Sequence, residues 1–187
     1  SQQFAEVLQI PVESVKPRIA DTDGIGYTSN TGGSGVTYKS GIAAIEAAYD
    51  VKKQMLERAS IMWETTVDKI TYGKGVFHLI ESNKEISFSK LAEKLNSLGG
   101  PVVGRANLNP STPGGSFAAS LVDVEIDPDT GKVSIIRFTS FQDAGKAIHP
   151  SYVEGQMQGG SVQGIGWALN EYYHIDNQGI MKNNTLL

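Results

Sequence analysis

Residues 117–141 read FAASLVDVEIDPDTGKVSIIRFTSF, and this stretch decides the fold class. From Phe117 to Ile126 apolar side chains alternate with other residues, which is typical of a β-strand with one covered face. The residue types of Asp127–Gly131 favour a tight turn, and the strand pattern then resumes from Val133 to Phe141. The stretch therefore predicts an antiparallel hairpin.

Two other segments have the spacing of long helices. Apolar residues recur at 3.6-residue intervals from Val36 to Ala59, and a glycine-interrupted helical pattern runs from Ser151 to Asn170. These are expected to be the two longest helices. Because helices and hairpins mix without regular βαβ repeats, the sequence predicts an α+β fold with a mixed or antiparallel sheet.

Shorter elements complete the expected order. We expect a helix at the start of the chain that ends at Pro11, then a strand from Val12 to Ile19. The other predicted elements are a hairpin over 67–79, a helix Ser87–Leu98 stopped by Gly99-Gly100-Pro101, loops at 21–35 and 109–115, and a final strand Glu171–Ile175 followed by a turn at 176–179.

Composition narrows the function classes. The 187 residues are 40% hydrophobic and 19% charged with a net charge of −4, which indicates an ordinary globular protein and gives no basic signal for nucleic acid. No apolar run approaches the ~20 residues of a membrane span. Cysteine is absent and the three histidines are scattered, so the chain itself offers no iron–sulfur or thiolate metal site.

Two glycine-rich segments carry the functional signal. Asn30-Thr31-Gly32-Gly33-Ser34-Gly35 precedes the first long helix, where bare backbone N–H groups attract anions. Residues 154–166, EGQMQGGSVQGIG, combine glycines with glutamine amides that suit a polar heterocycle. Together they suggest one cleft for an anionic, ring-bearing cofactor. The plainer alternatives are a surface loop capping a helix and a helix with small residues for close packing.

Other motifs are weaker. The first segment lacks the lysine of a P-loop, and the second lies inside one helical pattern rather than a Rossmann unit. Carboxylates were considered as acid–base groups, but the sequence brings no two of them together: Asp21, Asp23, Asp143, Glu154 and Glu171. Ser34 has no assignable histidine partner, so the sequence predicts no hydrolase triad and no catalytic residue.

Residues 117–166 resemble the molybdenum-cofactor-binding subunit of the molybdenum hydroxylases, the family of xanthine dehydrogenase, aldehyde oxidase and carbon monoxide dehydrogenase. The matching strings are VDVEIDPDTGKV at 122–133, DAGKAIHP at 143–150, and VEGQ through VQGIG at 153–166. Upstream, Asn30–Gly41 resembles the family's cofactor loop and the helix after it. The resemblance covers nearly the whole chain in order and spacing.

The resemblance implies roles for particular residues. Gly32, Gly33, Ser34, Gly35 and Val36 would line the pyranopterin and its phosphate through backbone N–H groups and a hydroxyl. Gln156 would hydrogen-bond the pterin ring, and Gln163, two turns later on the same helix, would support it. The family hydroxylates aldehydes, purines or N-heterocycles with oxygen derived from water, and passes electrons through iron–sulfur clusters to flavin.

The resemblance also implies what the chain lacks. The family's first glycine-rich cofactor segment would precede Ser1, its general-base glutamate would follow Leu187, and Gly35 stands where many members carry arginine. We therefore expect residues 1–187 to be a partial molybdopterin-binding domain, with a possible subdivision near 100–116. The isolated fragment is expected to be inactive and to bind the cofactor, molybdopterin with or without a nucleotide extension, weakly.

The resemblance further implies cytoplasmic location, iron–sulfur and FAD partner subunits or domains, and a small-molecule substrate, with no nucleic acid and no membrane span. An alternative is a non-catalytic assembly or binding module on the same scaffold. A third is a phosphate- or nucleotide-binding domain, which would bind simple nucleotides.

Overall fold

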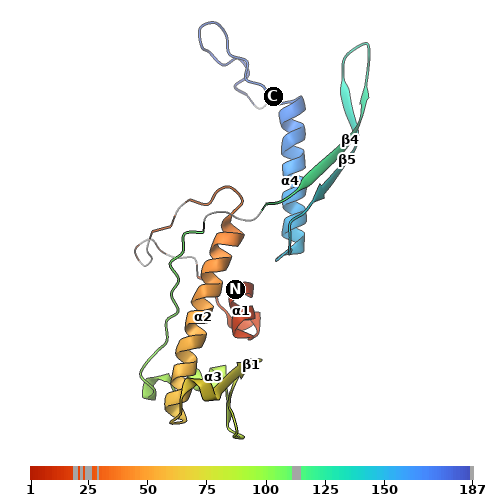
Figure 1. Cartoon of the computed structure of the whole chain (residues 1–187). Helices are drawn as coiled ribbons and strands as arrows, with labels where there is room; N and C mark the ends of the chain where they lie inside the picture. The colour runs from red at the N-terminus through yellow and green to blue at the C-terminus, as the bar shows by residue number, and fades with distance from the viewer. Residues whose placement is uncertain (19–20, 22, 24–26, 29, 111–114, 186–187) are drawn as a thin grey trace. The chain divides into compact units, whose positions relative to one another are not determined.

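A computed structural model describes residues 1–18, 21, 23, 27–28, 30–110 and 115–185. The chain divides into two compact units, Ser1–Pro113 and Gly114–Leu187. In chain order the described residues of the first unit form α1 (Gln2–Leu8), the 3-10 helix η1 (Val12–Ser14), α2 (Val36–Met62), η2 (Val67–Lys69), β1 (Ile70–Gly73), β2 (Val76–Leu79), β3 (Glu85–Ser87), α3 (Phe88–Ala92) and η3 (Leu95–Ser97). The second contains β4 (Ala118–Ile126), β5 (Val133–Gln142) and α4 (Pro150–Leu169) (Figure 1).

The predicted α+β class is confirmed, and so are its two longest helices, α2 and α4. The first unit holds an antiparallel sheet of order β1-β2-β3, and the second holds the antiparallel pair β4-β5. No helix among the described residues combines the length and apolar character needed to cross a membrane.

The core of the first unit forms where the C-terminal half of α2 meets the small sheet. Met55 and Ala59 of α2 are fully buried together with Phe77 of β2 and Leu91 of α3. Phe77 also lies 4.5 Å from Tyr72, ring centre to ring centre, across the β1–β2 pair. Burying an aromatic or large aliphatic side chain contributes ~1.5–3 kcal/mol, so this cluster anchors the unit.

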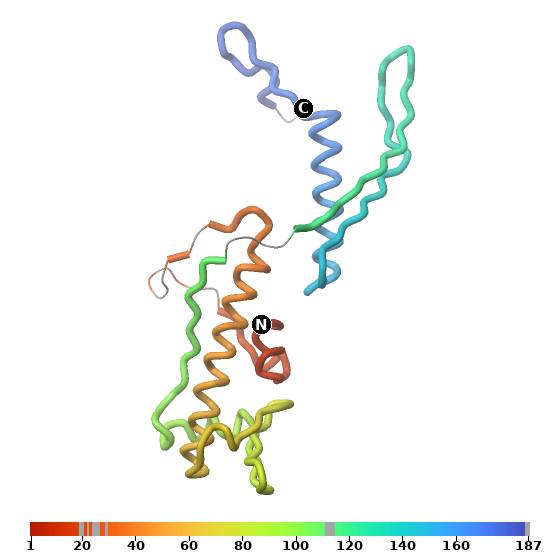
Figure 2. Tube along the Cα trace, viewed as in Figure 1, coloured from red at the N-terminus to blue at the C-terminus, as the bar shows by residue number. Residues whose placement is uncertain are grey.

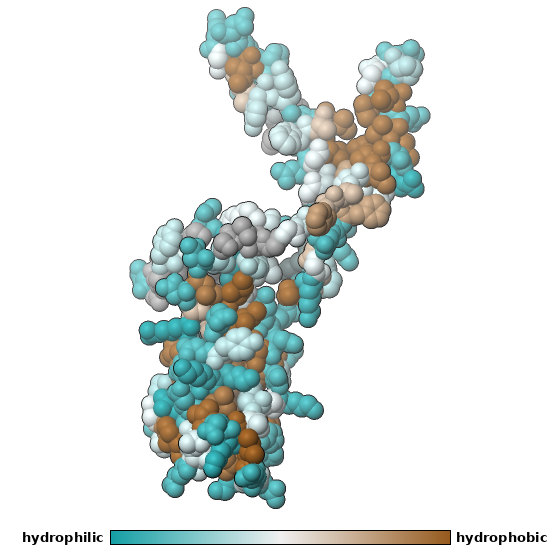
Figure 3. All heavy atoms as spheres, in the orientation of Figure 1, coloured by the Kyte–Doolittle hydropathy of each residue, from teal (hydrophilic) through white to brown (hydrophobic). Residues whose placement is uncertain are grey.

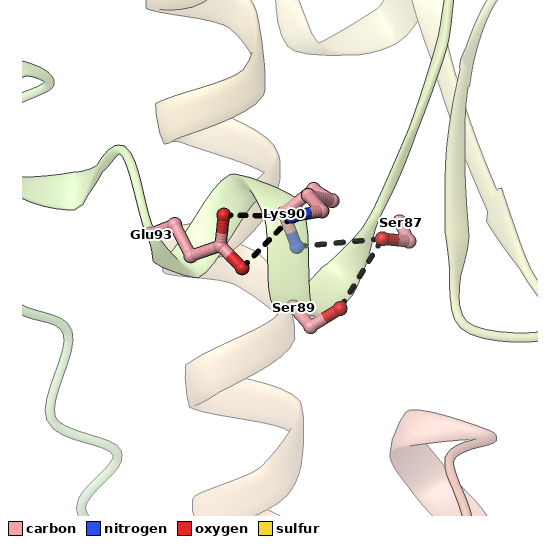
Figure 4. Close-up of polar contacts among 4 residues, drawn as sticks. All are labelled: Ser87, Ser89, Lys90 and Glu93. Carbon is pink, nitrogen blue, oxygen red and sulfur yellow. Dashed lines mark hydrogen bonds and ion pairs between the residues drawn. The ribbon is translucent and has the colours of Figure 1, made fainter.

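A serine cap starts α3. The Ser87 side chain accepts a hydrogen bond from the Lys90 backbone N–H at 3.3 Å, and Lys90 Nζ pairs with Glu93 at 3.0 Å (Figure 4). The predicted helix start is therefore right, but the predicted extent is wrong. The helix has only five residues, and the chain continues as η3 until Gly99 and Gly100, both at positive φ, end it.

Helix α1 is held against α2 and the sheet by close backbone contacts. Ala5, Leu8 and Ala48 are buried where the two helices meet. The Tyr72 hydroxyl donates to the Leu8 carbonyl oxygen, and the Lys74 N–H donates to Gln9 Oε1 at 2.5 Å. These bonds join residues that are 64 and 65 positions apart in the sequence.

An extended segment after η3 lies along α2 without belonging to any sheet (Figure 2). Three α2 side chains bind its backbone: Arg58 Nη2 donates to Gly99 O at 3.2 Å, the Gln54 amide bonds Val103, and Asp50 Oδ2 accepts from Arg105 N at 2.9 Å. Asp50, Gln54 and Arg58 are spaced by four, so they share one helix face. We call residues 99–105 the strap.

The second unit is built on the predicted hairpin. Strands β4 and β5 pair from Ala118↔Gln142 to Ile126↔Val133, with an irregularity in register next to Asp123. Asp127 Oδ1 accepts from the N–H groups of Asp129 and Thr130, and Gly131 has φ 70°, so the predicted turn is confirmed.

One face of the hairpin packs against α4, and much of its apolar surface remains exposed. Open grooves of about 380 and 230 Å³ run along this seam and share Phe138 and Ile165. None of residues 115–185 is buried, and Leu121 is 64% exposed. Apolar residues gather along the hairpin in Figure 3.

Two predicted strands are wrong. Residues 12–14 form η1 and 15–18 form no strand, because Pro17 has no N–H to donate and the segment finds no partner; Ile19 lies outside the described residues. Glu171–His174 is also not a strand. The Asn183 side chain bonds Tyr172 O and His174 N instead, and only Ile175 forms an isolated bridge, with Met181. Strand β3 was not predicted.

The partly buried Tyr72 leads to a prediction about how stability depends on pH. Burial raises the pKa of Tyr72 from 10.0 to about 12. A raised pKa means that the neutral form is favoured in the folded state, so its contribution to stability is complete below pH ~10 and is lost between about pH 10 and 12. We expect the unfolding free energy, measured by urea titration, to fall less across this window in Tyr72→Phe than in the wild type.

The control for this experiment is Tyr27→Phe, because Tyr27 is 96% exposed. This variant should follow the wild-type curve. Equal losses between pH 10 and 12 in wild type and Tyr72→Phe would contradict the assignment.

Candidate functional site

The glycine loop before α2 makes a sharp turn into the helix. Gly33 and Ser34 both have left-handed backbone angles, with φ 63° and 53°. Gly35 is the N-cap residue; its N–H donates to Gly32 O at 3.4 Å and its carbonyl accepts from Lys39 N at 2.9 Å. The first N–H groups of a helix have no partner within the helix, and a glycine N-cap cannot satisfy them with a side chain. The loop therefore leaves backbone donors available at the start of α2.

The charge at this helix start is positive. The first turn of the 27-residue α2 contains no acidic residue. Lys39 folds back toward the N-cap, with Cε 3.4 Å from where a Cβ on Gly35 would lie. A lysine adds to the positive end of the helix dipole instead of offsetting it, so this end favours a negatively charged group. Sequence reasoning missed Lys39, although it is the first charged residue after the glycines.

Helix α4 begins one residue before the predicted start at Ser151. Pro150 occupies its first turn, where a missing N–H costs nothing, and His149 is the N-cap. The His149 ring stacks on Tyr152 at 4.0 Å between centres, and Ser151 Oγ lies 3.2 Å from His149 Nδ1. These contacts fix the direction in which the helix leaves the hairpin.

Helix α4 has two opposite faces. Met157, Ser161 and Ile165, spaced by four, line the seam with the hairpin. Gln156 and Gln163, seven residues apart, lie on the other face with Gly159 and Gly160 between them, and all four are exposed. The second face therefore presents two amides on either side of bare backbone.

Most of the glycines on α4 have no packing role within the second unit. A Cβ added at these positions would meet no described atom within 4 Å: Gly155, Gly159, Gly160 and Gly164. Gly166 differs, because a Cβ there would lie 2.7 Å from Glu171 Oε1. Close helix packing, the plainer interpretation of this segment, is thus absent inside the second unit. A flat group could approach the bare backbone without meeting side chains.

The predicted binding residues fall into two sets. Gly32, Gly33, Ser34, Gly35 and Val36 form one continuous loop and helix start in the first unit, and Gln156 and Gln163 share one face of α4 in the second. The expectation that both sets line a single cleft stays a prediction.

The carboxylates considered as acid–base groups serve local structure. Asp21 Oδ1 accepts from Asp23 N at 3.0 Å, and Asp143 Oδ1 accepts from Gly145 N at 2.9 Å. Glu154 lies at the hairpin seam and Glu171 lies beside Gly166. Among the described residues, no three histidine, aspartate or glutamate side chains gather into a metal site.

Comparison with known proteins identifies the family to which the chain belongs. The model of the molybdopterin cofactor-binding domain matches residues 1–187. The xanthine dehydrogenase molybdenum-binding subunit of Escherichia coli O157:H7 is 29% identical over 194 residues, covering 100% of this chain and 26% of the relative. The nicotine 6-hydroxylase large subunit of Paenarthrobacter nicotinovorans is 32% identical over 196 residues, which cover 100% of this chain and 24% of the relative.

A solved structure agrees. The crystal structure of a Cu,Mo-CO dehydrogenase in its carbon monoxide-reduced state matches with a TM-score of 0.86 and 27% identity, over 98% of this chain and 24% of that chain. The chain thus spans about a quarter of the length of the proteins it matches. With a family model matched over its whole length, this chain belongs to the molybdopterin cofactor-binding domain family.

Proposed function

We propose that residues 1–187 form part of the cofactor-binding portion of a molybdenum hydroxylase large subunit. The complete enzyme would hydroxylate an aldehyde, purine or N-heterocycle with oxygen derived from water. The observation that carries the proposal is the exposed Gln156–Gln163 face of α4, whose glycines have no packing partner within the second unit. The xanthine and nicotine enzymes among the relatives support this substrate range.

The loop before α2 suits the anionic end of the cofactor. Backbone N–H groups of Gly32–Val36 and the Ser34 hydroxyl would bind the phosphate, at the positive end of a 27-residue helix. Lys39, folded toward Gly35, would add a charge-assisted contact to the same phosphate. The donor set therefore fits a phosphate and does not depend on a metal ligand from the chain.

The free face of α4 suits the ring system. A glutamine amide can donate and accept at once, which matches the mixed edge of a pterin. Gln156 would bond the ring, and Gln163, two turns on, would support it. Gly159 and Gly160 would let the ring approach the helix backbone between them.

When bound, the molybdenum cofactor supplies the redox chemistry of hydroxylation, and these residues would only bind and orient it. The general base and the remaining cofactor contacts would come from other parts of the enzyme, as would iron–sulfur and FAD subunits or domains and the substrate pocket. A cytoplasmic location fits this chemistry. The two compact units support a subdivision of the domain within 100–116.

Substitutions of Gln156 and Gln158, which lie on opposite faces of α4, test the proposed site. In a complete large subunit that contains residues 1–187, Gln156→Ala should lower molybdopterin affinity roughly tenfold, since it removes one or two ring hydrogen bonds. The matched control is Gln158→Ala, because Gln158 faces the hairpin seam. The affinity of each variant is measured as the cofactor content per subunit while the protein is diluted. Equal retention in the two variants would contradict the proposed orientation of α4.

Substituting the glycines of α4 should raise the stability of the chain but lower its cofactor binding. Gly159→Ala and Gly160→Ala should each stabilise the 187-residue chain by up to ~1 kcal/mol in thermal or urea unfolding, because alanine is the better helix former and nothing obstructs its Cβ. In the complete subunit the same changes should reduce cofactor content. A stabilised subunit with full cofactor content would argue against ring contact at these glycines.

The isolated chain tests how much of the binding site it contains. Each missing charge-assisted hydrogen bond contributes on the order of 1.5–3 kcal/mol, so the loss of several should prevent stoichiometric molybdenum binding. We expect no turnover of xanthine, aldehydes or N-heterocycles with an artificial electron acceptor. Stoichiometric molybdenum with turnover would show that a residue within 1–187 supplies the base. A complete subunit that never acquires the cofactor would favour the non-catalytic module.

A further inference from the structure

The strap, residues 99–105, is fastened to α2 in an unusual way. A strand normally pairs its backbone with another strand, but here single side chains at three successive turns of α2 take up the backbone groups. The Gln54 amide makes the two hydrogen bonds that a neighbouring strand would otherwise make with Val103. Its Nε2 donates to Val103 O at 2.9 Å, and its Oε1 accepts from Val103 N at 3.3 Å. The strap therefore has few, separable attachments.

The two ends of the strap are held by different chemistry. At the first end, the Arg58 guanidinium lies under Gly99, within 2.5 Å of where a Cβ would be, and donates to its carbonyl oxygen. At the other end, Asp50 Oδ2 accepts from the Arg105 N–H at 2.9 Å. Arginine keeps its charge at all ordinary pH values, whereas a carboxylate can be neutralised by acid.

Between the two ends, shape fixes the strap. A Cβ on Gly104 would overlap the Ala47 carbonyl oxygen and would lie 2.5 Å from Val51 Cγ2. Only glycine lets the backbone come this close to the helix. The hydrogen bonds from Gln54 and Asp50 lie on either side of this contact, so they depend on it.

We propose that the strap is a pH-sensitive element that opens from its Asp50 end on acidification, while its Arg58 end and the core of the first unit stay folded. The trigger is protonation of the Asp50 carboxylate, which weakens its hold on the Arg105 N–H. The other groups that act on this carboxylate are the Gln54 amide and the charges of Lys53 and Arg105.

The direction of the pH effect follows from the hydrogen bonds. The bond from the Arg105 backbone, followed by that from the Gln54 side chain, lowers the pKa of Asp50 from its ordinary 3.8. A lowered pKa means that the bond contributes stability above pH ~4 and loses it as pH falls through the folded-state value. Opening is therefore expected below pH ~4.

Opening would free a defined piece of chain. The strap runs antiparallel to α2, since Gly99 lies at Arg58 and Arg105 at Asp50. Asp50 lies about four turns, ~22 Å, beyond Gly35, and the extended residues 106–110 after Arg105 span ~17 Å. Release of the Arg105 end would thus free Ala106–Pro110, which continues toward the start of α2. The proposal does not depend on the cofactor assignment.

Residue-resolved amide hydrogen exchange on the 187-residue chain tests this, with protection factors measured from pH 6 to pH 3. The Arg105 amide should lose protection several-fold, and at most about sevenfold at pH 3 because the ordinary pKa of the carboxyl is 3.8, whereas the amides of β2 should not. Asp50→Asn should have low Arg105 protection already at pH 6, with no further fall. Glu57→Gln, an exposed change on the same helix, should match the wild type.

Three outcomes would overturn the proposal. One is parallel loss at Arg105 and in β2, which would mean global acid unfolding. Another is an Arg105 amide whose protection does not change with pH in the wild type. The third is loss of the Asn96–Gly100 protection before that of Arg105, which would place the opening at the Arg58 end. Gly104→Ala provides a second variant, because it should expose the Val103 and Arg105 amides at every pH.

Discussion

The first unit depends on α2 being one unbroken 27-residue helix whose faces bind different partners. Buried Met55 and Ala59 meet the small sheet, buried Ala48 meets α1, and Asp50, Gln54 and Arg58 hold the strap. A break in α2 would put these three contacts out of register at once. Long isolated helices are marginal in water, so α2 is in turn held straight by the elements that it organises.

The same helix links packing to the proposed site. Its C-terminal half carries the core, whereas its start carries the glycine loop, Lys39 and the unpaired N–H groups. The dipole at the start exists only while the turns behind it stay hydrogen-bonded. Core packing at Phe77 therefore supports the electrostatics of a loop that it does not touch.

Local patterns in the sequence predicted what local physics determines. The 3.6-residue period identified α2 and α4, and Asp127–Gly131 identified the β4–β5 turn, because each signal lies within the element that it specifies. The strand expected at Glu171–Ile175 failed because backbone pairing is limited to the bridge at Ile175 and its neighbours, and the Asn183 side chain binds Tyr172 O and His174 N. The strap was missed for the converse reason: its partners are side chains about 40 to 55 residues earlier.

The residues of the candidate site also divide into those that the sequence could predict and those that it could not. Glycines and glutamines at fixed spacing on α4 could be assigned to one face from the sequence, since helical periodicity decides it. Lys39 could not be assigned to the site from the sequence, because its proposed role depends on its side chain folding back toward Gly35. A meeting of the two segments in one cleft would be a long-range relation, and no local pattern encodes such a relation.

In the proposed site, the glycines of α4 would favour ligand approach at a cost in helix stability. Each of Gly155, Gly159, Gly160 and Gly164 lowers helix stability by up to ~1 kcal/mol, and a Cβ at these positions would find no contact within the second unit. None of residues 115–185 is buried, so the unit has little stability in reserve. A ligand that binds only the folded helix would shift its folding equilibrium by mass action. In the proposed site, ligand binding to the glutamine face would therefore stabilise the fold of α4, and the glycines that weaken the free helix would make this effect larger.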